Sequence, residues 1–137
     1  MIVLLDTNVV LDALLARSPF EMDAAKLFAA AETGKVDGFL CATTITTIHY
    51  IARKAAGKAK AIEHIDDLLA IFQITSVTSA VIKSALAIEF ADFEDAVLHE
   101  AGAAIGAQAI VTRNATDFAK ATIPVYKPPQ IISHLHL

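Results

Sequence analysis

Three aspartates that are far apart in the sequence each stand where a predicted element begins or ends. Asp6 follows the apolar run 2–5, which predicts a strand buried on both of its faces. Asp95 lies in the first turn of a predicted helix, and Asp117 lies shortly after another apolar run, 109–112. The carboxyl ends of parallel strands border the crevice in which open α/β sheets bind ligands. We therefore expect the side chains of Asp6, Asp95 and Asp117 to converge there.

Converging carboxylates favour the binding of a divalent cation. Asp92 and Asp95 are three residues apart in the predicted helix and share one face of it. Like charges aimed into one crevice repel each other unless a cation lies between them. Carboxylate oxygens suit Mg²⁺ or Mn²⁺, and such an ion activates water for in-line attack on a phosphodiester. Taken singly, these residues are also ordinary helix caps and turn residues; as a set they predict a nuclease-type metal site.

The elements that must position these acids are short strands alternating with helices. Apolar runs predict strands at residues 2–5, 38–42, 74–77, 109–112 and 123–126. Helical spacing and capping residues predict helices at residues 9–15, 21–33, 43–56, 58–72, 79–88 and 92–107, with a short helix within 113–120. This alternation is typical of an α/β fold whose parallel sheet is covered by helices on both faces.

Length and composition predict a single domain over residues 1–137. Apolar residues make up 55% of the chain and charged residues 19%, which excludes a disordered protein. A charged residue interrupts every apolar run within roughly 18 residues, so we expect no membrane-spanning helix. The start of the chain lacks the pattern of a signal peptide and the single cysteine, Cys41, agrees with a reducing compartment, so we expect a cytoplasmic protein. The net charge of −4 argues against binding nucleic acid through overall charge.

Several short segments of the sequence resemble the PIN-domain ribonucleases, and within them the small single-domain toxins of the VapC type. These segments are 5–9 (LDTNV), 92–96 (DFEDA), 111–114 (VTRN) and 117–118 (DF). Their order and spacing extend the resemblance over essentially the whole chain. The resemblance implies a three-layer α/β/α sandwich with a parallel five-stranded sheet, and an Mg²⁺- or Mn²⁺-dependent endoribonuclease. It also implies a homodimer and, for a toxin, an antitoxin partner.

The resemblance also implies roles for individual residues. Asp6, Asp95 and Asp117 match the metal-binding, catalytic acids of the family. The supporting polar positions are Asn8, Thr47, Asp92, Thr112 and Asn114. Thr47 stands where the family commonly has a glutamate, in a segment, 42–49, that contains no acid. A threonine can hydrogen-bond a water but supplies no negative charge, so we expect weaker metal affinity than in a four-acid site.

Basic residues give weaker indications of RNA binding. Arg53 and Lys54, near the end of a predicted helix, are candidates for contacts with RNA phosphates, as is Arg113 beside the predicted crevice. The alternative is a solvated helix end with cations placed favourably at its carboxyl terminus. His64 and His99 are expected at the surfaces of their helices.

Two functions from different classes remain open at this stage. One is a metal-dependent endoribonuclease that acts as a toxin silenced by an antitoxin; the other is a catalytically weak RNA-binding or protein-interaction module. Thr47 separates them, because the second function follows from the missing glutamate. A phosphatase of the haloacid-dehalogenase type is disfavoured, since it needs a second aspartate where this chain has Asn8. The apolar helices 9–15, 21–33 and 58–72 predict a surface for another protein chain.

Overall fold

A parallel five-stranded sheet lies at the centre of the computed structural model, which describes all residues from 1 to 137. The strand order is β3-β2-β1-β4-β5. The strands are β1 (Ile2–Leu5), β2 (Asp37–Cys41), β3 (Gln73–Thr75), β4 (Ala109–Val111) and β5 (Val125–Tyr126). Each overlaps a range predicted from an apolar run, which confirms the α/β class and the five parallel strands.

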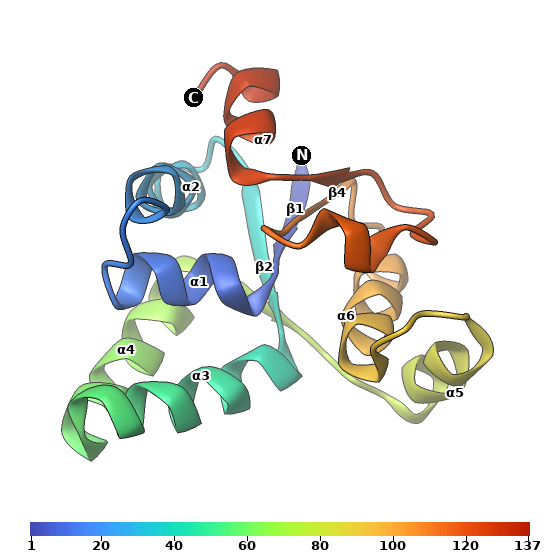
Figure 1. The fold of residues 1–137 in the computed structure, drawn as a ribbon, viewed down its shortest axis with the longest axis horizontal. Helices are drawn as coiled ribbons and strands as arrows, with labels where there is room; N and C mark the ends of the chain where they lie inside the picture. The colour runs from blue at the N-terminus through green and yellow to red at the C-terminus, as the bar shows by residue number, and fades with distance from the viewer.

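Helices cover both faces of this sheet, as Figure 1 shows. One face carries α1 (Thr7–Leu14), α2 (Glu21–Glu32), α3 (Ala42–Ala56), α4 (Lys58–Ile71) and α7 (Pro128–Leu135). The other face carries α5 (Ser79–Ala87), α6 (Phe93–Ala104) and a short 3-10 helix, η1 (Ala115–Phe118). None of these helices has the length and apolar character that crossing a membrane requires.

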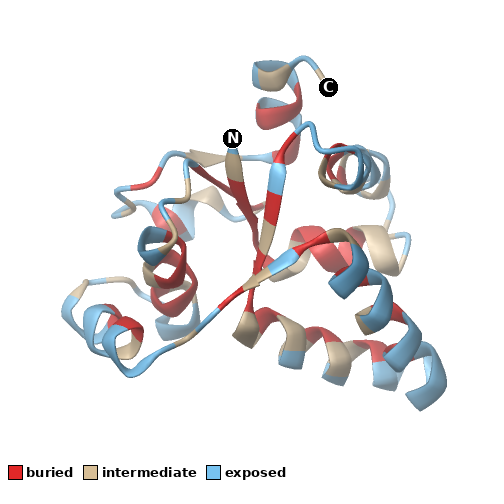
Figure 2. Ribbon diagram, turned by 180° about the vertical axis from the view of Figure 1, so that it is seen from behind, coloured by how far each residue is buried: buried red, intermediate tan, exposed pale blue.

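The strand β1 is apolar at every position because helices cover the sheet on both of its faces. Val3 and Leu5 belong to the hydrophobic cluster on the face of α1, whereas Leu4 belongs to the cluster on the face of α6. Successive side chains of a strand point to opposite faces, so a central strand covered on both sides needs an apolar residue at each step. In Figure 2 the strands at the centre of the sheet are coloured as largely buried.

The junction after β1 brings residues from the two ends of the chain together. Leu5 pairs with Val111 in the register of β1 and β4, and the backbone N–H of Asp6 donates to the carbonyl oxygen of Val111 at 2.9 Å. The chain then turns at once into α1, because Asp6 is the N-cap and its side chain accepts a hydrogen bond from the backbone N–H of Thr7. Asp6 is thereby fixed at the carboxyl edge of the sheet.

Two histidines lie inside the protein, and the prediction that they are at helix surfaces is wrong. His64 on α4 and His99 on α6 are both buried. The loop before β5 folds over His99, whose Nε2 accepts hydrogen bonds from the backbone N–H groups of Thr122 at 3.1 Å and Ile123 at 3.4 Å. His99 Nδ1 is then left to donate to Glu100, 2.9 Å away. His99 thus satisfies backbone groups that the loop would otherwise bury unpaired.

Candidate active site

An acidic cavity of about 410 Å³ opens where β1 and β4 end and α6 begins. We call it the acid pocket. Its lining residues are Asp6, Thr7, Asn8, Leu11, Arg17, Thr47, Asp92, Glu94, Asp95, Arg113, Asn114 and Asp117. The structure therefore brings the three predicted metal-binding acids together with four of the supporting positions. Thr112, the fifth supporting position, is buried behind the cavity and does not line it.

Asp6 is the most buried carboxylate of the pocket, with 8% of its surface exposed. Its Oδ2 accepts a hydrogen bond from the Thr112 hydroxyl at 2.8 Å, and its Oδ1 accepts one from the backbone N–H of Thr7 at 2.8 Å. Burial raises the pKa of Asp6 above its ordinary value, and the charges of Asp92 and Asp117 raise it further, while the two hydrogen bonds lower it. Asp6 is therefore held in place at the cost of poorer solvation of its charge.

Thr112 and Asn8 fix Asp6 from behind. The Thr112 oxygen also accepts a hydrogen bond from the backbone N–H of Asn114 at 3.1 Å, which orients the hydroxyl proton toward Asp6. The Asn8 side-chain NH₂ donates to Asp6 Oδ2 at 3.3 Å, and its Oδ1 accepts from the backbone N–H of Arg113 at 3.3 Å. Both side chains are thus positioning groups.

Asp95 faces Asp6 from the first turn of α6. The helix begins there because Asp92 is its N-cap and accepts a hydrogen bond from the backbone N–H of Asp95 at 2.9 Å. Burial raises the pKa of Asp95 from 3.8 to about 7, helped by the charges of Asp6, Asp92, Asp117 and Glu94, in that order. A bound cation would reverse this effect, because it favours the charged form of each carboxylate.

The donor set of the pocket fits a hard divalent ion in its chemistry. All candidate ligands are oxygens, which is the preference of Mg²⁺ and Mn²⁺. As the side chains lie, however, no three acidic, histidine or cysteine side chains are close enough together to hold one ion. A bound ion would relieve the repulsion between neighbouring carboxylates that, after burial, raises the pKa of Asp95.

Glu94 is a pocket residue that the sequence analysis missed. The hydroxyl of Thr47, on α3, lies within hydrogen-bond distance of two acceptors, the carbonyl oxygen of Thr43 at 3.2 Å and Glu94 Oε1, on α6, at 3.4 Å. Glu94 therefore reaches from α6 toward the place where the resembling proteins carry a glutamate on the helix after the second strand. A signal was present in the sequence, because Asp92, Glu94 and Asp95 put three acids within one helical turn.

A buried ion cluster borders the acid pocket, and two of its members were also missed. Asp12, on α1, is 1% exposed, and its carboxylate accepts from Arg113 Nε at 2.6 Å and Arg113 Nη2 at 3.2 Å. Arg17 Nε lies 3.0 Å from Asp12 Oδ1, without a hydrogen-bond alignment. Two guanidinium groups share one carboxylate, so the cluster carries one net positive charge at the edge of the pocket. A lone aspartate in an apolar helix was the signal for such a buried pair.

Arg53 and Lys54, the other predicted RNA contacts, do not line the acid pocket. They follow Thr47 by about two helical turns, or about 9–10 Å along α3. The Lys54 ammonium lies 4.5 Å from the centroid of the Tyr50 ring instead. The structure therefore places them away from the acids, and leaves Arg17 and Arg113 as the cations beside them.

Comparisons with known proteins agree with this fold. The sequence profile of the PIN domain matches residues 2–116. VapBC2 from Rickettsia felis, solved bound to a DNA fragment from its promoter, superposes with a TM-score of 0.70 at 14% identity and covers 93% of this chain and 98% of its own. A toxin-antitoxin complex from Klebsiella pneumoniae gives 0.70 at 20% identity, covering 92% and 97%.

A third solved structure is VapC20 from Mycobacterium tuberculosis, a toxin that cleaves the sarcin-ricin loop. It gives a TM-score of 0.63 at 15% identity and covers 79% of this chain and 86% of its own. No curated protein sequence matches the chain at a significant level. At these identities the solved structures support the fold alone, whereas the profile match extends over most of the chain. Profile and fold together show that the chain belongs to the PIN-domain family.

Proposed function

We propose that the protein is a divalent-metal-dependent endoribonuclease and the toxin of a toxin-antitoxin pair. The observation that carries this proposal is the convergence of Asp6, Asp92, Asp95 and Asp117 in one cavity from three separate elements. Folding gathers like charges only at a cost, and two of these carboxyl groups have a raised pKa. A cation-binding function accounts for that cost.

Different residues of the acid pocket have different roles in the proposed hydrolysis of a phosphodiester. Asp6, Asp95 and Asp117 would hold Mg²⁺ or Mn²⁺, which supplies an activated water and neutralises charge on the phosphoryl oxygens. Thr112 and Asn8 keep Asp6 aimed into the pocket. The net positive charge shared by Arg17 and Arg113 faces the negative charge of an RNA strand, so these groups orient the substrate.

Glu94 has a specific part in this proposal. The family position that commonly holds a glutamate is Thr47 here, and the Thr47 hydroxyl lies 3.4 Å from Glu94 Oε1. Glu94 thus supplies a carboxylate from α6 at a place where α3 supplies none. The pocket therefore has five carboxylates, those of Asp6, Asp92, Glu94, Asp95 and Asp117, and none of them comes from α3.

The second candidate function is a catalytically weak RNA-binding or protein-interaction module. Thr47 favours it, because a site without the usual glutamate binds metal less tightly. The two candidates predict different responses to metal. An endoribonuclease is activated by Mg²⁺ or Mn²⁺ at millimolar concentrations or below, whereas the module binds RNA without cleaving it.

The decisive experiment incubates the purified protein with structured RNAs and Mn²⁺, Mg²⁺ or EDTA. We expect cleavage with either ion and none with EDTA or with Asp6→Asn. The matched control is Asp37→Asn, which removes an exposed acid at the start of β2 that does not line the pocket. Cleavage that persists in both EDTA and Asp6→Asn would show a contaminating nuclease. Tight RNA binding without cleavage at any metal concentration would favour the module.

We further propose that an antitoxin segment lies in an apolar groove between α1, α2 and α4. The groove has a volume of about 560 Å³, and its lining includes Leu14, Phe28, Ala29 and Ile71, with Glu32 and Asp67 as its acids. A helix with an apolar face and basic flanks fits such a lining. Relatives with this fold have been crystallised as toxin-antitoxin complexes.

Light scattering tests both the antitoxin and a homodimer. We expect a dimer of the protein alone and a larger complex with a candidate antitoxin. Ala29→Arg blocks the groove at an exposed helix position and should abolish the larger complex while leaving the dimer. A strict monomer at high concentration would contradict the homodimer.

A further inference from the structure

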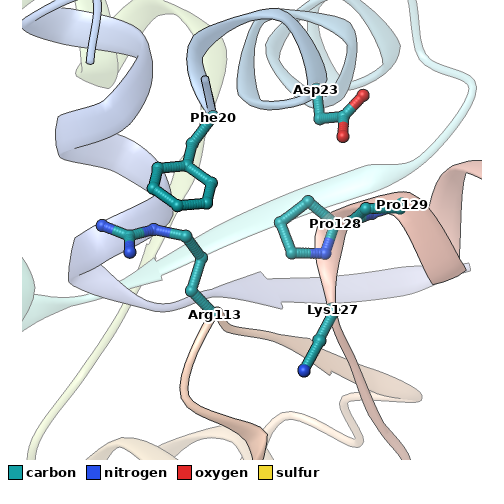
Figure 3. A pocket seen from close by; sticks show the side chains of 6 residues that line it. All are labelled: Phe20, Asp23, Arg113, Lys127, Pro128 and Pro129. Carbon is teal, nitrogen blue, oxygen red and sulfur yellow. The ribbon is translucent and has the colours of Figure 1, made fainter. Parts of the chain in front are cut away.

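A second cavity, of about 230 Å³, lies next to the acid pocket. We call it the side pocket. Its lining residues are Phe20, Asp23, Arg113, Lys127, Pro128 and Pro129 (Figure 3). Arg113 lines both cavities, so a strand that crosses from one to the other passes over its side chain. None of the predicted metal-binding acids contributes to the side pocket.

Rigid rings form the walls of the side pocket. Phe20 precedes α2 and is 41% exposed. The Arg113 guanidinium stacks 4.0 Å from the centroid of its ring and is itself fixed by two hydrogen bonds to buried Asp12. Figure 3 places Pro128 across the cavity from Phe20. The Phe20 ring is thus held by its contact with Arg113, which the ion pair with Asp12 fixes in turn. Part of the apolar surface of the ring stays exposed, and such a surface suits a planar ligand.

Two polar side chains of the side pocket, those of Asp23 and Lys127, have no side-chain partner within the protein. Asp23 is half-buried, and its carboxylate makes no hydrogen bond or ion pair. Lys127 is exposed and makes no ion pair. A carboxylate accepts hydrogen bonds from amino groups, and an ammonium attracts phosphate. The volume is below the ~300–1,000 Å³ of pockets for drug-sized ligands, which points to one planar ring.

We propose that the side pocket binds one unstacked base of the RNA substrate, next to the phosphate that is cut. The base carries an exocyclic amino group, as cytosine, adenine and guanine do. Phe20 and Pro128 hold its ring, Asp23 accepts from its amino group, and Lys127 contacts a neighbouring phosphate. The proposal places position 4 of a pyrimidine, or the amino group of a purine, against Asp23; in that orientation uracil is disfavoured, because its O4 is an acceptor and its one donor, N3–H, is at the neighbouring position. This inference rests on the proposed ribonuclease function, whose substrate it narrows.

Amide chemical shifts of the isotope-labelled protein test the binding without metal and without cleavage. The probes are cytidine and uridine 5′-monophosphates, whose bases differ along one edge: cytosine has a 4-amino group and an unprotonated N3, whereas uracil has a 4-oxo group and an N3–H. We expect both nucleotides to shift the amide signals near Phe20, Asp23 and Lys127. Cytidine monophosphate should bind about tenfold more tightly, because uridine monophosphate lacks the amino group that donates to Asp23. The acid pocket amides should shift less than these.

Variants assign the contacts. Phe20→Ala should weaken cytidine monophosphate on the order of tenfold, which is the scale of one base-aromatic stack. Asp23→Asn should bring the two nucleotides within about twofold of each other, because an amide both donates and accepts. Met22→Ala, on an exposed apolar side chain near Phe20 that lines neither cavity, is the matched control and should change nothing. Thermal melts check that each variant is folded.

Two results would overturn the inference. The first is that uridine monophosphate binds as tightly as cytidine monophosphate. The second is that Phe20→Ala leaves nucleotide binding unchanged, which would indicate that the side pocket binds a peptide instead of a base. End mapping of a cleaved random RNA adds a second measurement, in which uridine should be depleted at one position beside the cut and restored by Asp23→Asn. Metal-dependent cleavage without base binding would refute this inference alone, and base binding without cleavage would refute the proposed ribonuclease function alone.

Discussion

At the scale of single residues, Asp6 combines two opposing demands. Its hydrogen bonds to Thr112 and Thr7 fix its position, while its burial makes the charged form costly. Residues kept for function at the expense of stability have this character. The costs of charge at Asp6 and Asp95 lead to two predictions, and the contact between Thr47 and Glu94 leads to a third.

Asp6→Asn should abolish metal-dependent cleavage and raise the melting temperature by a few degrees. The amide oxygen keeps the hydrogen bond from the Thr112 hydroxyl, and the NH₂ group loses the one from the Thr7 N–H; we expect removal of a buried charge that Asp92 and Asp117 repel to outweigh that loss. Calorimetry of the metal-free variant beside the parent measures the second effect. A lower melting temperature for Asp6→Asn would mean that the carboxylate stabilises the fold.

Asp95 should make the metal-free protein less stable as the pH rises from about 4 to about 7. Its pKa is about 7 in the folded protein and near 3.8 when unfolded, so the folded state binds more protons between these values. Stability is then highest below the unfolded pKa and is lost as the pH approaches the folded one. Melting temperatures of the parent and Asp95→Asn at pH 5.5 and pH 8 test this, and the variant should show the smaller change between the two pH values.

Mg²⁺ should raise the melting temperature of the parent more at pH 8 than at pH 5.5, because protons compete with the ion for the carboxylates.

Glu94→Gln should raise the Mg²⁺ concentration needed for half-maximal activity, and Thr47→Glu should lower it. Thr47 faces the acid pocket, so a glutamate there adds a ligand without burying a charge in the core. Without metal, Thr47→Glu should melt at a lower temperature, because its carboxylate would lie beside that of Glu94. The double variant should recover the parental metal dependence. Isothermal titration with Mn²⁺ measures affinity apart from activity.

At the scale of elements, the position of α6 determines where Asp95 and Glu94 lie. Gly102 allows this helix to approach β1 closely, since a Cβ atom there would come within 2.9 Å of Leu4 Cδ2. Leu4 is completely buried and cannot move away freely. Gly102 follows Asp95 by seven residues, which is two helical turns on the same face.

Gly102→Val should therefore lower the free energy of unfolding and weaken metal binding together. Overpacking costs about 1–3 kcal/mol, which exceeds the fraction of 1 kcal/mol gained by replacing a helical glycine. Urea unfolding and a Mn²⁺ titration measure the two effects. The matched control is Ala103→Val at the neighbouring exposed position, which should leave metal binding unchanged and lower the free energy of unfolding only by the difference in helix propensity, a fraction of 1 kcal/mol. If Gly102→Val is less stable but binds Mn²⁺ as tightly as the parent, the close approach of α6 to β1 does not determine the geometry of the metal site.

Local patterns in the sequence predicted most elements, because their causes are local. The apolar run 2–5 predicts a central strand, and Asp92 predicts the start of a helix, without knowledge of any distant residue. Long-range partners were not predictable in this way. The ion pair of Asp12 with Arg113 joins residues 101 positions apart, and the loop that covers His99 comes 23 residues after it. Periodicity carries no information about such pairs.

At the scale of the whole molecule, acidic and basic surfaces occur side by side. The chain has a net charge of −4, yet Arg17, Arg113 and Lys127 line the two adjoining cavities. RNA binding should therefore depend on few phosphate contacts. The overall charge would oppose a long electrostatic footprint.

The salt dependence of RNA binding should be shallow. With two or three phosphates neutralised, the logarithm of the association constant should fall with a slope of about −1.4 to −2.1 against the logarithm of salt concentration. Fluorescence anisotropy of a labelled single-stranded RNA with the Asp6→Asn variant at constant Mg²⁺ measures this slope. Lys127→Ala should reduce the magnitude of the slope by about 0.7. The control is Lys83→Ala, which removes an exposed lysine on α5 and should leave the slope unchanged. A slope steeper than about −4 would indicate a wide basic surface that these cavities do not account for.

The central place of β1 in the sheet affects how the protein is made on the ribosome. Asp6 is synthesised 106 residues before its hydrogen-bond partner Thr112, and β4 must emerge before β1 is paired on both sides. Asp117 follows later still. A nascent or prematurely terminated chain therefore has the first acid without the others. If the proposed ribonuclease function holds, the chain must be translated past Asp117 before it can cleave any RNA, including that of the ribosome that is making it.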